Sequence, residues 1–118
     1  MKLGAALKSL LDEPGVLAAL LFTRDGLAVE MYGYGLRANE LAAQAAGMAG
    51  AARRGCRSLG LGEPQVLRVG LKEHTLDIYP LGDYDVVVVS SLSAAPAEQA
   101  GPVAEKIGTL RLSLKGEA

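Results

Sequence analysis

The chain has 118 residues, of which 50% are hydrophobic and 21% are charged, a composition typical of one globular domain and not of a disordered segment. Twelve basic and thirteen acidic residues give a net charge of −1, and no basic stripe stands out, which disfavours nucleic-acid binding. The apolar runs are too short to span a membrane, Lys8 interrupts the run that a signal peptide would need, and the one cysteine can form no intrachain disulfide. We therefore expect one cytoplasmic domain over residues 1–118.

The first segment predicts a helix followed by a buried strand. Leucines spaced at i, i+4 and i+7 predict a helix over Lys2–Leu11. This helix ends before Pro14, because proline disfavours helical geometry in the preceding residue. The nearly unbroken apolar run Val16–Thr23 predicts a strand that is covered on both faces.

The stretch FTRDGLAVE (Phe22–Glu30) predicts a hairpin. Asp-Gly between two apolar runs favours a tight turn, because hairpin turns need positive φ at their central positions. The second strand is expected over Leu27–Tyr32, with its odd-numbered residues on one face and its even-numbered residues on the other. Because no catalytic group accompanies the charged tip, we interpret this hairpin as architectural.

The rest of the chain predicts two long helices separated by three strands. The middle helix is expected over about Arg37–Gly55. A final helix is expected over about Pro102–Leu114, where apolar residues recur at i, i+4, i+7 and i+11; a start nearer Ala97, with a kink at Pro102, is the alternative. The strands between them are predicted at Gln65–Leu71, Thr75–Tyr79 and Tyr84–Ser90.

The order of elements is therefore αββαβββα. Short links between successive strands indicate a mostly antiparallel sheet of five strands. Its central strands are apolar on both faces and need cover on both, which three helices supply with one on one face and two on the other. The expected fold class is α/β of the α+β type.

The middle helix has an apolar arc that is wider than one sheet face requires. An Ala-rich helix chosen for propensity alone is one interpretation. Against it, Gly47 and Gly50 each cost about 0.5–1 kcal/mol in a helix interior. We favour a second interpretation, in which one half of the arc packs on the sheet and the other half on a second copy of the chain.

Two sets of residues follow from this interpretation. The expected dimer interface on this helix comprises Leu41, Ala42, Ala45, Ala46, Met48, Ala49 and Ala52. The polar stripe on the other side of the same helix comprises Glu40, Gln44, Gly47, Ala51 and Arg54.

No pattern of catalytic or ligand-binding residues stands out. His74 is the one histidine and lies in a polar turn, and Cys56 has no histidine near it in sequence. Gly33-Tyr34-Gly35 lies between a strand and a helix but lacks the rest of any phosphate-binding motif. A zinc site needs several cysteine or histidine ligands, and this sequence has one of each. We expect no catalytic residue, no metal and no cofactor, and hence no enzymatic activity.

Four stretches resemble the Roadblock/dynein light chain family and, within it, the bacterial MglB-like branch. They are LLDEPGVLAALLFTRDGLAVE (Leu10–Glu30), ELAAQAAGMAGAARR (Glu40–Arg54), EPQVLRVGLKEHTLDIYPLGDYDVVVVSS (Glu63–Ser91) and the closing amphipathic helix. The resemblance covers almost the whole chain and lies in the order of elements, not in a single motif.

The resemblance implies a dimer in which the middle helix and the third strand join two sheets into one, which adds Val66 and Arg68 of the third strand to the expected interface. It implies that the paired middle helices form one broad face, so the polar stripe of this helix is the expected partner-binding surface. It also implies a non-catalytic role in binding and regulating small Ras-like GTPases or in scaffolding. MglB-type proteins stimulate GTP hydrolysis by their partner MglA without an arginine finger. They often continue in a longer C-terminal tail than this chain, which ends at Ala118, so stimulation of hydrolysis stays open.

The leading hypothesis is therefore a homodimeric module that binds and regulates an MglA-type GTPase, with no nucleic-acid partner and no membrane insertion. The alternative is a structural adaptor or signalling scaffold that binds a protein other than a GTPase.

Overall fold

The computed structural model describes residues 3–33, 36–91 and 96–116 and confirms the predicted order of elements. The elements are α1 (Leu3–Lys8), the 3-10 helix η1 (Ser9–Asp12), β1 (Val16–Thr23), β2 (Ala28–Gly33), α2 (Ala38–Ser58), β3 (Leu67–Gly70), β4 (His74–Pro80), β5 (Tyr84–Ser91) and α3 (Pro96–Gly116). The predicted first helix is thus α1 continued by η1. The last helix takes the longer alternative, with Pro102 inside it.

The five strands form one antiparallel sheet in the order β2-β1-β5-β4-β3. The two strands that read as apolar on both faces, β1 and β5, pair with each other at its centre, and nearly all of their residues are buried. The strands β2 and β3 form its two edges.

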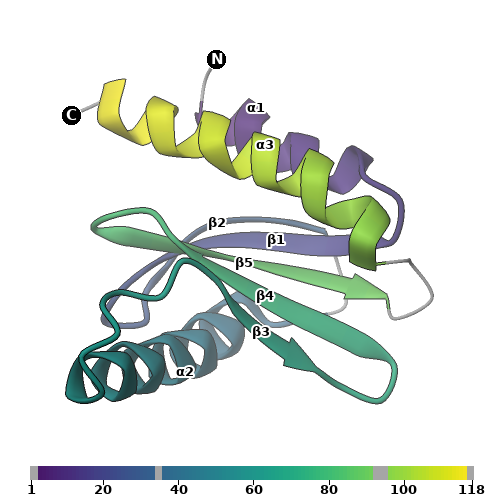
Figure 1. Ribbon diagram of the computed structural model, residues 1–118. Helices are drawn as coiled ribbons and strands as arrows, with labels where there is room; N and C mark the ends of the chain where they lie inside the picture. Colours follow the sequence, from purple (N-terminus) through teal and green to yellow (C-terminus); the bar gives the residue numbers. More distant parts are fainter. Residues whose placement is uncertain (1–2, 34–35, 92–95, 117–118) are drawn as a thin grey trace.

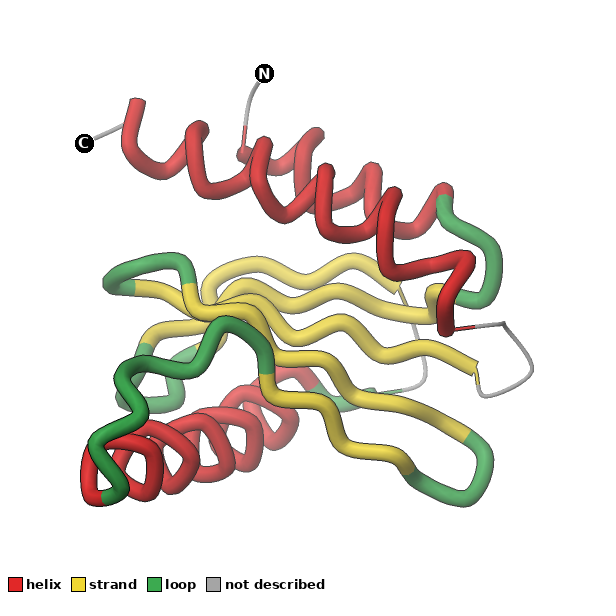
Figure 2. The backbone as a smooth tube through the Cα atoms, in the orientation of Figure 1, coloured by secondary structure: helices red, strands yellow, loops and turns green. Residues whose placement is uncertain are grey.

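Helices cover both faces of the sheet, as expected (Figures 1 and 2). α1 and α3 lie side by side over one face, where Leu7, Leu10, Ile107 and Leu110 pack on β1 and β5. α2 lies alone under the other face, where its alanines pack on Leu20, Phe22, Val87 and Ile78. The sheet thus separates two apolar cores, and α2 is the one described helix on its side (Figure 1).

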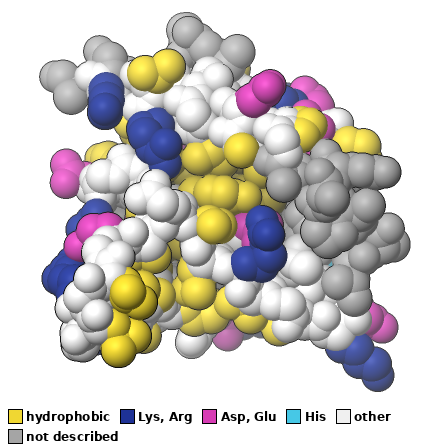
Figure 3. Space-filling model, in the orientation of Figure 1, with side chains coloured by type: hydrophobic (Ala, Val, Ile, Leu, Met, Phe, Trp, Pro, Cys, Tyr) yellow, Lys and Arg dark blue, Asp and Glu magenta, His cyan; other side chains and the backbone are white. Residues whose placement is uncertain are grey.

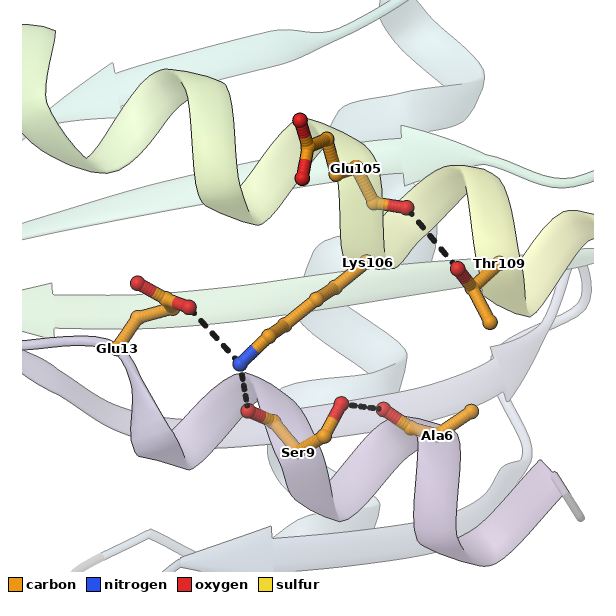
Figure 4. A network of polar contacts seen from close by, with 6 residues as sticks. All are labelled: Ala6, Ser9, Glu13, Glu105, Lys106 and Thr109. Atoms are coloured by element: carbon orange, nitrogen blue, oxygen red, sulfur yellow. Dashed lines mark hydrogen bonds and ion pairs between the residues drawn. The ribbon is translucent and has the colours of Figure 1, made fainter. Parts of the chain in front are cut away.

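A cluster of polar contacts ties α3 to the start of the chain (Figure 4). The Lys106 ammonium group donates to the carbonyl oxygen of Ser9 at 2.7 Å and pairs with the Glu13 carboxylate at 2.8 Å. The Ser9 hydroxyl donates in turn to the carbonyl oxygen of Ala6 at 2.7 Å. A lysine that reaches the last carbonyl groups of a short helix satisfies acceptors that the helix itself leaves open.

The alternation predicted for the second strand is wrong, because a β-bulge interrupts it. Phe22 pairs with Ala28, and the preceding residue of β1, Leu21, pairs with Glu30. Val29 is therefore an extra residue, and a bulge shifts the faces of the residues on either side. Ala28 and Met31 both pack toward α2, whereas Val29 is 50% exposed.

Candidate interaction surface

The face of α2 that meets the sheet consists of small side chains. Its buried residues are Ala42, Ala45, Ala46, Ala49 and Arg53. Four of these, the alanines, were predicted to lie in a dimer interface, but they pack on the sheet of the same subunit and are at most 8% exposed. Their side chains are already covered, so that part of the predicted interface needs correction: these alanines belong to the monomer core.

The opposite face of α2 carries the predicted partner stripe at the surface. Glu40, Gln44, Gly47, Ala51 and Arg54 are all exposed. Apart from the adjoining backbone and neighbours in its own helix, no described atom lies within 4 Å of a Cβ placed at Gly47. Glu40 makes a long contact of 3.9 Å with Arg37, and both side chains are largely exposed. The middle of the stripe therefore exposes helix backbone at Gly47, with the acidic Glu40 at one end and the basic Arg54 at the other.

One flank of α2 faces the β3 edge of the sheet and is only partly covered. Leu41, Met48 and Ala52 recur at i, i+7 and i+11, which places them on one side of the helix, and all three are half-buried. Ala52 and Leu67 of β3 line the same small cavity, which shows the side toward which this flank points. We call Leu41, Met48 and Ala52 the α2 flank.

The β3 edge continues this apolar surface. β3 pairs with β4 on one side, and no other strand of the described residues pairs with it. Val66 and Leu71, at the two ends of β3, are 40% and 47% exposed. Beyond the end of α2, Leu59 and Leu61 are the most exposed large apolar residues described, at 73% and 74%. Figure 3 shows hydrophobic side chains at the surface over this end of α2, at lower left.

Arg68 lies on the other face of β3, away from α2. Its Nε donates to the Asp77 carboxylate of β4 at 2.7 Å, and this hydrogen bond raises the pKa of the Arg68 guanidinium. Burial, followed by the negative charge of Asp77, raises the pKa of the Tyr79 hydroxyl beside them. Of the two β3-edge residues predicted in the interface, Val66 is thus at the exposed apolar edge and Arg68 is in a charged pair.

An ion pair that the sequence interpretation missed joins α2 to the sheet. Arg53 Nη2 donates to Asp85 Oδ1 of β5 at 2.5 Å, and the side chains are 7% and 0% exposed. Two signals in the sequence indicate it: an arginine at a sheet-facing helical spacing, and an aspartate at the head of the valine run in β5.

The Asp25-Gly26 hairpin supports α2, which agrees with its interpretation as architectural. The Leu27 N–H donates to the Thr23 hydroxyl at 3.0 Å, and the hydroxyl also donates to the Asp25 carboxylate. Gly26 has φ +93°, and a Cβ there would lie 3.3 Å from the Ala43 Cα. Glycine is needed both for this backbone geometry and for the close approach to the helix.

The described residues contain no group of three or more potential metal ligands among His, Cys, Asp and Glu. His74 is exposed and Cys56 is half-buried on α2. Of the loop Gly33-Tyr34-Gly35, the last two residues lie outside the described ranges. No described helix has the length and apolarity needed to cross a bilayer.

A groove of about 520 Å³ lies on the α1 and α3 side of the sheet, away from α2. It is lined mainly by apolar side chains: Leu3, Leu21, Val29, Leu81 and Leu114, with Gly82, Asp83, Tyr84 and Lys115. The lining residues include no histidine, cysteine or serine. The arrangement of α2 and β3 can recognise another protein by shape and charge, and we take it as the candidate site.

Comparison with known proteins agrees with this fold. The Roadblock/LC7 domain model matches residues 2–91, from α1 through β5. The crystal structure of a Roadblock/LC7 domain from Streptomyces avermitilis has a TM-score of 0.85 at 21% identity, covering 99% of this chain and 98% of that one. Myxococcus xanthus MglB has a TM-score of 0.82 at 17% identity, covering 98% and 94%.

The gliding protein MglB from Thermus thermophilus has a TM-score of 0.77 at 20% identity, covering 92% of this chain and 87% of that one. Comparison with curated proteins finds no match. The family model spans well over half of the sequence, from the first helix to the last strand, and the chain therefore belongs to the Roadblock/LC7 domain family.

Proposed function

We propose that this protein is a non-catalytic homodimeric module that binds and regulates a small Ras-like GTPase of the MglA type through its α2 helices. The observation that carries the proposal is the surface of α2. A shallow exposed stripe runs along its outer side, and an open apolar flank runs beside it toward an unpaired strand edge. Roadblock domains act generally as binding modules and not as enzymes.

A second copy of the chain is the proposed occupant of the α2 flank and the β3 edge. Edge strands present unpaired N–H and C=O groups that pair readily with another strand. A two-fold axis places the same patch on both subunits, so β3 would meet β3 and the α2 flank would meet its own copy. The revised interface comprises Leu41, Met48, Ala52 and Val66, with Arg68 near its margin.

The GTPase is the proposed partner of the remaining face. Two α2 helices side by side present two copies of the stripe from Glu40 to Arg54 on one broad surface. Its open middle at Gly47 admits close approach of a partner backbone, and the charged residues near its ends give orientation. MglB structures at 17% and 20% identity share this fold. This function places the protein in the bacterial cytoplasm.

Two measurements test the proposal. Light scattering at high micromolar concentration is expected to give the mass of a dimer, and a clean monomer would contradict the interface. Titration with the MglA-type GTPase of the same organism, loaded with GDP or a GTP analogue, is expected to show binding that depends on the nucleotide.

The same titration separates the alternatives. The double variant Glu40→Arg with Arg54→Glu is expected to bind at least tenfold more weakly, while Lys72→Glu, in the distant β3–β4 turn, serves as the control. Hydrolysis measured in the same mixtures shows whether the module also activates the GTPase. Failure to bind in either nucleotide state would point instead to a structural adaptor for another protein.

A further inference from the structure

The one buried ion pair between described residues of α2 and the sheet is Arg53–Asp85. The carboxylate of Asp85 is 0% exposed, and its Oδ2 has no hydrogen-bond partner among the described residues. Arg53 therefore supplies the contact that compensates a charge lying inside the α2-side core. Removing an ion from water is costly, so such a pair tolerates little change in the distance between its partners.

The rest of the buried face of α2 does little to fix the position of the helix along its axis. Its fully buried part consists of four alanines, whose single methyl groups form low ridges against the sheet. The half-buried Leu41 and Met48 pack against the margin of the same core. A shift of four residues, about 6 Å at 1.5 Å per residue, would bring positions 38, 41, 42, 45 and 49 under the sheet in place of 42, 45, 46, 49 and 53. Those positions hold four alanines and one leucine. Alanine replaces alanine at three of the four sites and Leu41 replaces Ala45, while Ala46 and Arg53 leave the buried face. Arg53 is the one charged residue that the shift removes.

The connection that follows α2 has backbone freedom for such a shift. The link to β3 runs from Leu59 to Val66 and contains Gly60 and Gly62, both with positive φ. The hairpin that rests on α2 approaches the Ala43 Cα, the Ala42 carbonyl oxygen and the Ala46 methyl group through Gly26. A shift of four residues would bring Asn39 to the place of Ala43 and Ala42 to the place of Ala46, so a methyl group and helix backbone would still face the hairpin.

We propose that Arg53 and Asp85 are a positioning pair, which selects one axial position of α2 on the sheet. The pair thereby sets where the stripe from Glu40 to Arg54 is presented to a partner. In the shifted position Asp85 would face Ala49, which leaves both charges without their counter-ion. The importance of this position for binding rests on the proposed function, whereas the position itself does not.

The test compares an apolar replacement of the pair with the parent chain. In Arg53→Met with Asp85→Leu, both charges are removed and the bulk is largely kept. Spin labels are attached at Ala51→Cys on α2 and Lys72→Cys in the β3–β4 turn, in a Cys56→Ala background. Labelled chains are diluted with excess unlabelled chains so that each dimer holds at most one labelled copy. The control replaces the exposed pair Arg57–Glu63, whose atoms are 2.9 Å apart, by the same two apolar residues.

The parent and the control are expected to give one narrow distance, and the apolar variant is expected to give a second population displaced by several ångströms. Affinity for the GTPase, measured on unlabelled chains, should fall in proportion to the fraction f that keeps the original distance, since the apparent Kd equals Kd divided by f. With half of the molecules shifted, the apparent Kd rises about twofold.

A single unchanged distance in the apolar variant overturns the positioning role. Should that variant fail to fold, Asp85→Asn is used in its place, because it keeps an acceptor for Arg53 and removes the charge. Asp85→Asn is expected to show a smaller population at the second distance. A single unchanged distance in Asp85→Asn would also overturn the positioning role. A second distance with unchanged GTPase affinity would support the axial selection and reject the stripe as the binding surface. Absence of GTPase binding by the parent chain would reject the proposed function. The spin-label distances would still test whether the Arg53–Asp85 pair sets the axial position of α2.

Discussion

Breaking the Arg53–Asp85 pair from one side is expected to destabilise the protein severely. Arg53→Met leaves the Asp85 carboxylate 0% exposed and without its one described partner. Loss of one member of a buried pair costs about 3–5 kcal/mol, because an uncompensated charge stays in the core. The total free energy of unfolding of a domain of this size is about 5–15 kcal/mol, so this one substitution removes a large part of it. The midpoint of thermal unfolding should fall by roughly 10–20 °C.

Replacing both members should cost far less than replacing one. In Arg53→Met with Asp85→Leu no buried charge remains, and such replacements are often neutral or stabilising. We expect the double variant to recover all but about 1–2 kcal/mol of the parent stability. A double-mutant cycle by urea unfolding measures this, at one fixed chain concentration because the apparent stability of any chain that associates depends on concentration. If Arg53→Met alone costs less than about 1 kcal/mol, the carboxylate is hydrated in solution, and the energetic reasoning about a desolvated pair is refuted.

Four further predictions follow from the core, the edge strand, a tyrosine and a helix glycine. Ala46→Arg is expected to unfold the subunit and not merely to split a dimer, because Ala46 is 8% exposed under the sheet; circular dichroism against temperature distinguishes the two outcomes. Val66→Arg should weaken dimerisation at least tenfold by light scattering with unchanged secondary structure, whereas Leu27→Arg, at a residue 63% exposed in the hairpin, should leave the mass unchanged. Burial and a nearby carboxylate raise the pKa of Tyr79 above 10.0, so the stability it contributes is complete below pH 10.0 and is lost as pH rises through the folded-state pKa; tyrosinate absorbance that appears at lower pH in the folded than in the unfolded chain would contradict this. Gly47→Ala should stabilise the subunit by about 0.5–1 kcal/mol in urea and weaken GTPase binding, and unchanged binding would show that no partner backbone approaches there.

The sheet and its helices were predictable because their signals are local and redundant. The apolar runs of β1 and β5 indicated central strands, and Asp25-Gly26 fixed the first hairpin. The bulge at Val29 was not predictable, because inserting one residue changes the pairing without changing the composition of the strand. Pro102 suggested a helix start, but the helix begins at Pro96 and continues through it.

The burial of α2 was predictable in outline and not residue by residue. The wide apolar arc predicted that the sheet covers only part of it, but composition alone could not say which residues the sheet takes. The sheet takes Ala42, Ala45, Ala46 and Ala49, and the larger Leu41 and Met48 are left on the flank. Arg53 was hidden because an arginine near a helix end usually faces solvent, and its partner Asp85 is distant in sequence.

The pairing of β1 with β5 has a consequence for how the chain folds during synthesis. Thr23 pairs with Tyr84 and Val16 with Ser90, so the middle of the sheet joins segments made early and late. Contacts this far apart in sequence slow folding, because a long loop must close before they form. While the ribosome is still making β3 and β4, β1 lacks its partner β5. The edge of β1 that will pair with β5 is therefore exposed during this time. The native sheet can close only once Ser91 has left the exit tunnel, so the apolar strand β1 gains its central neighbour late in synthesis.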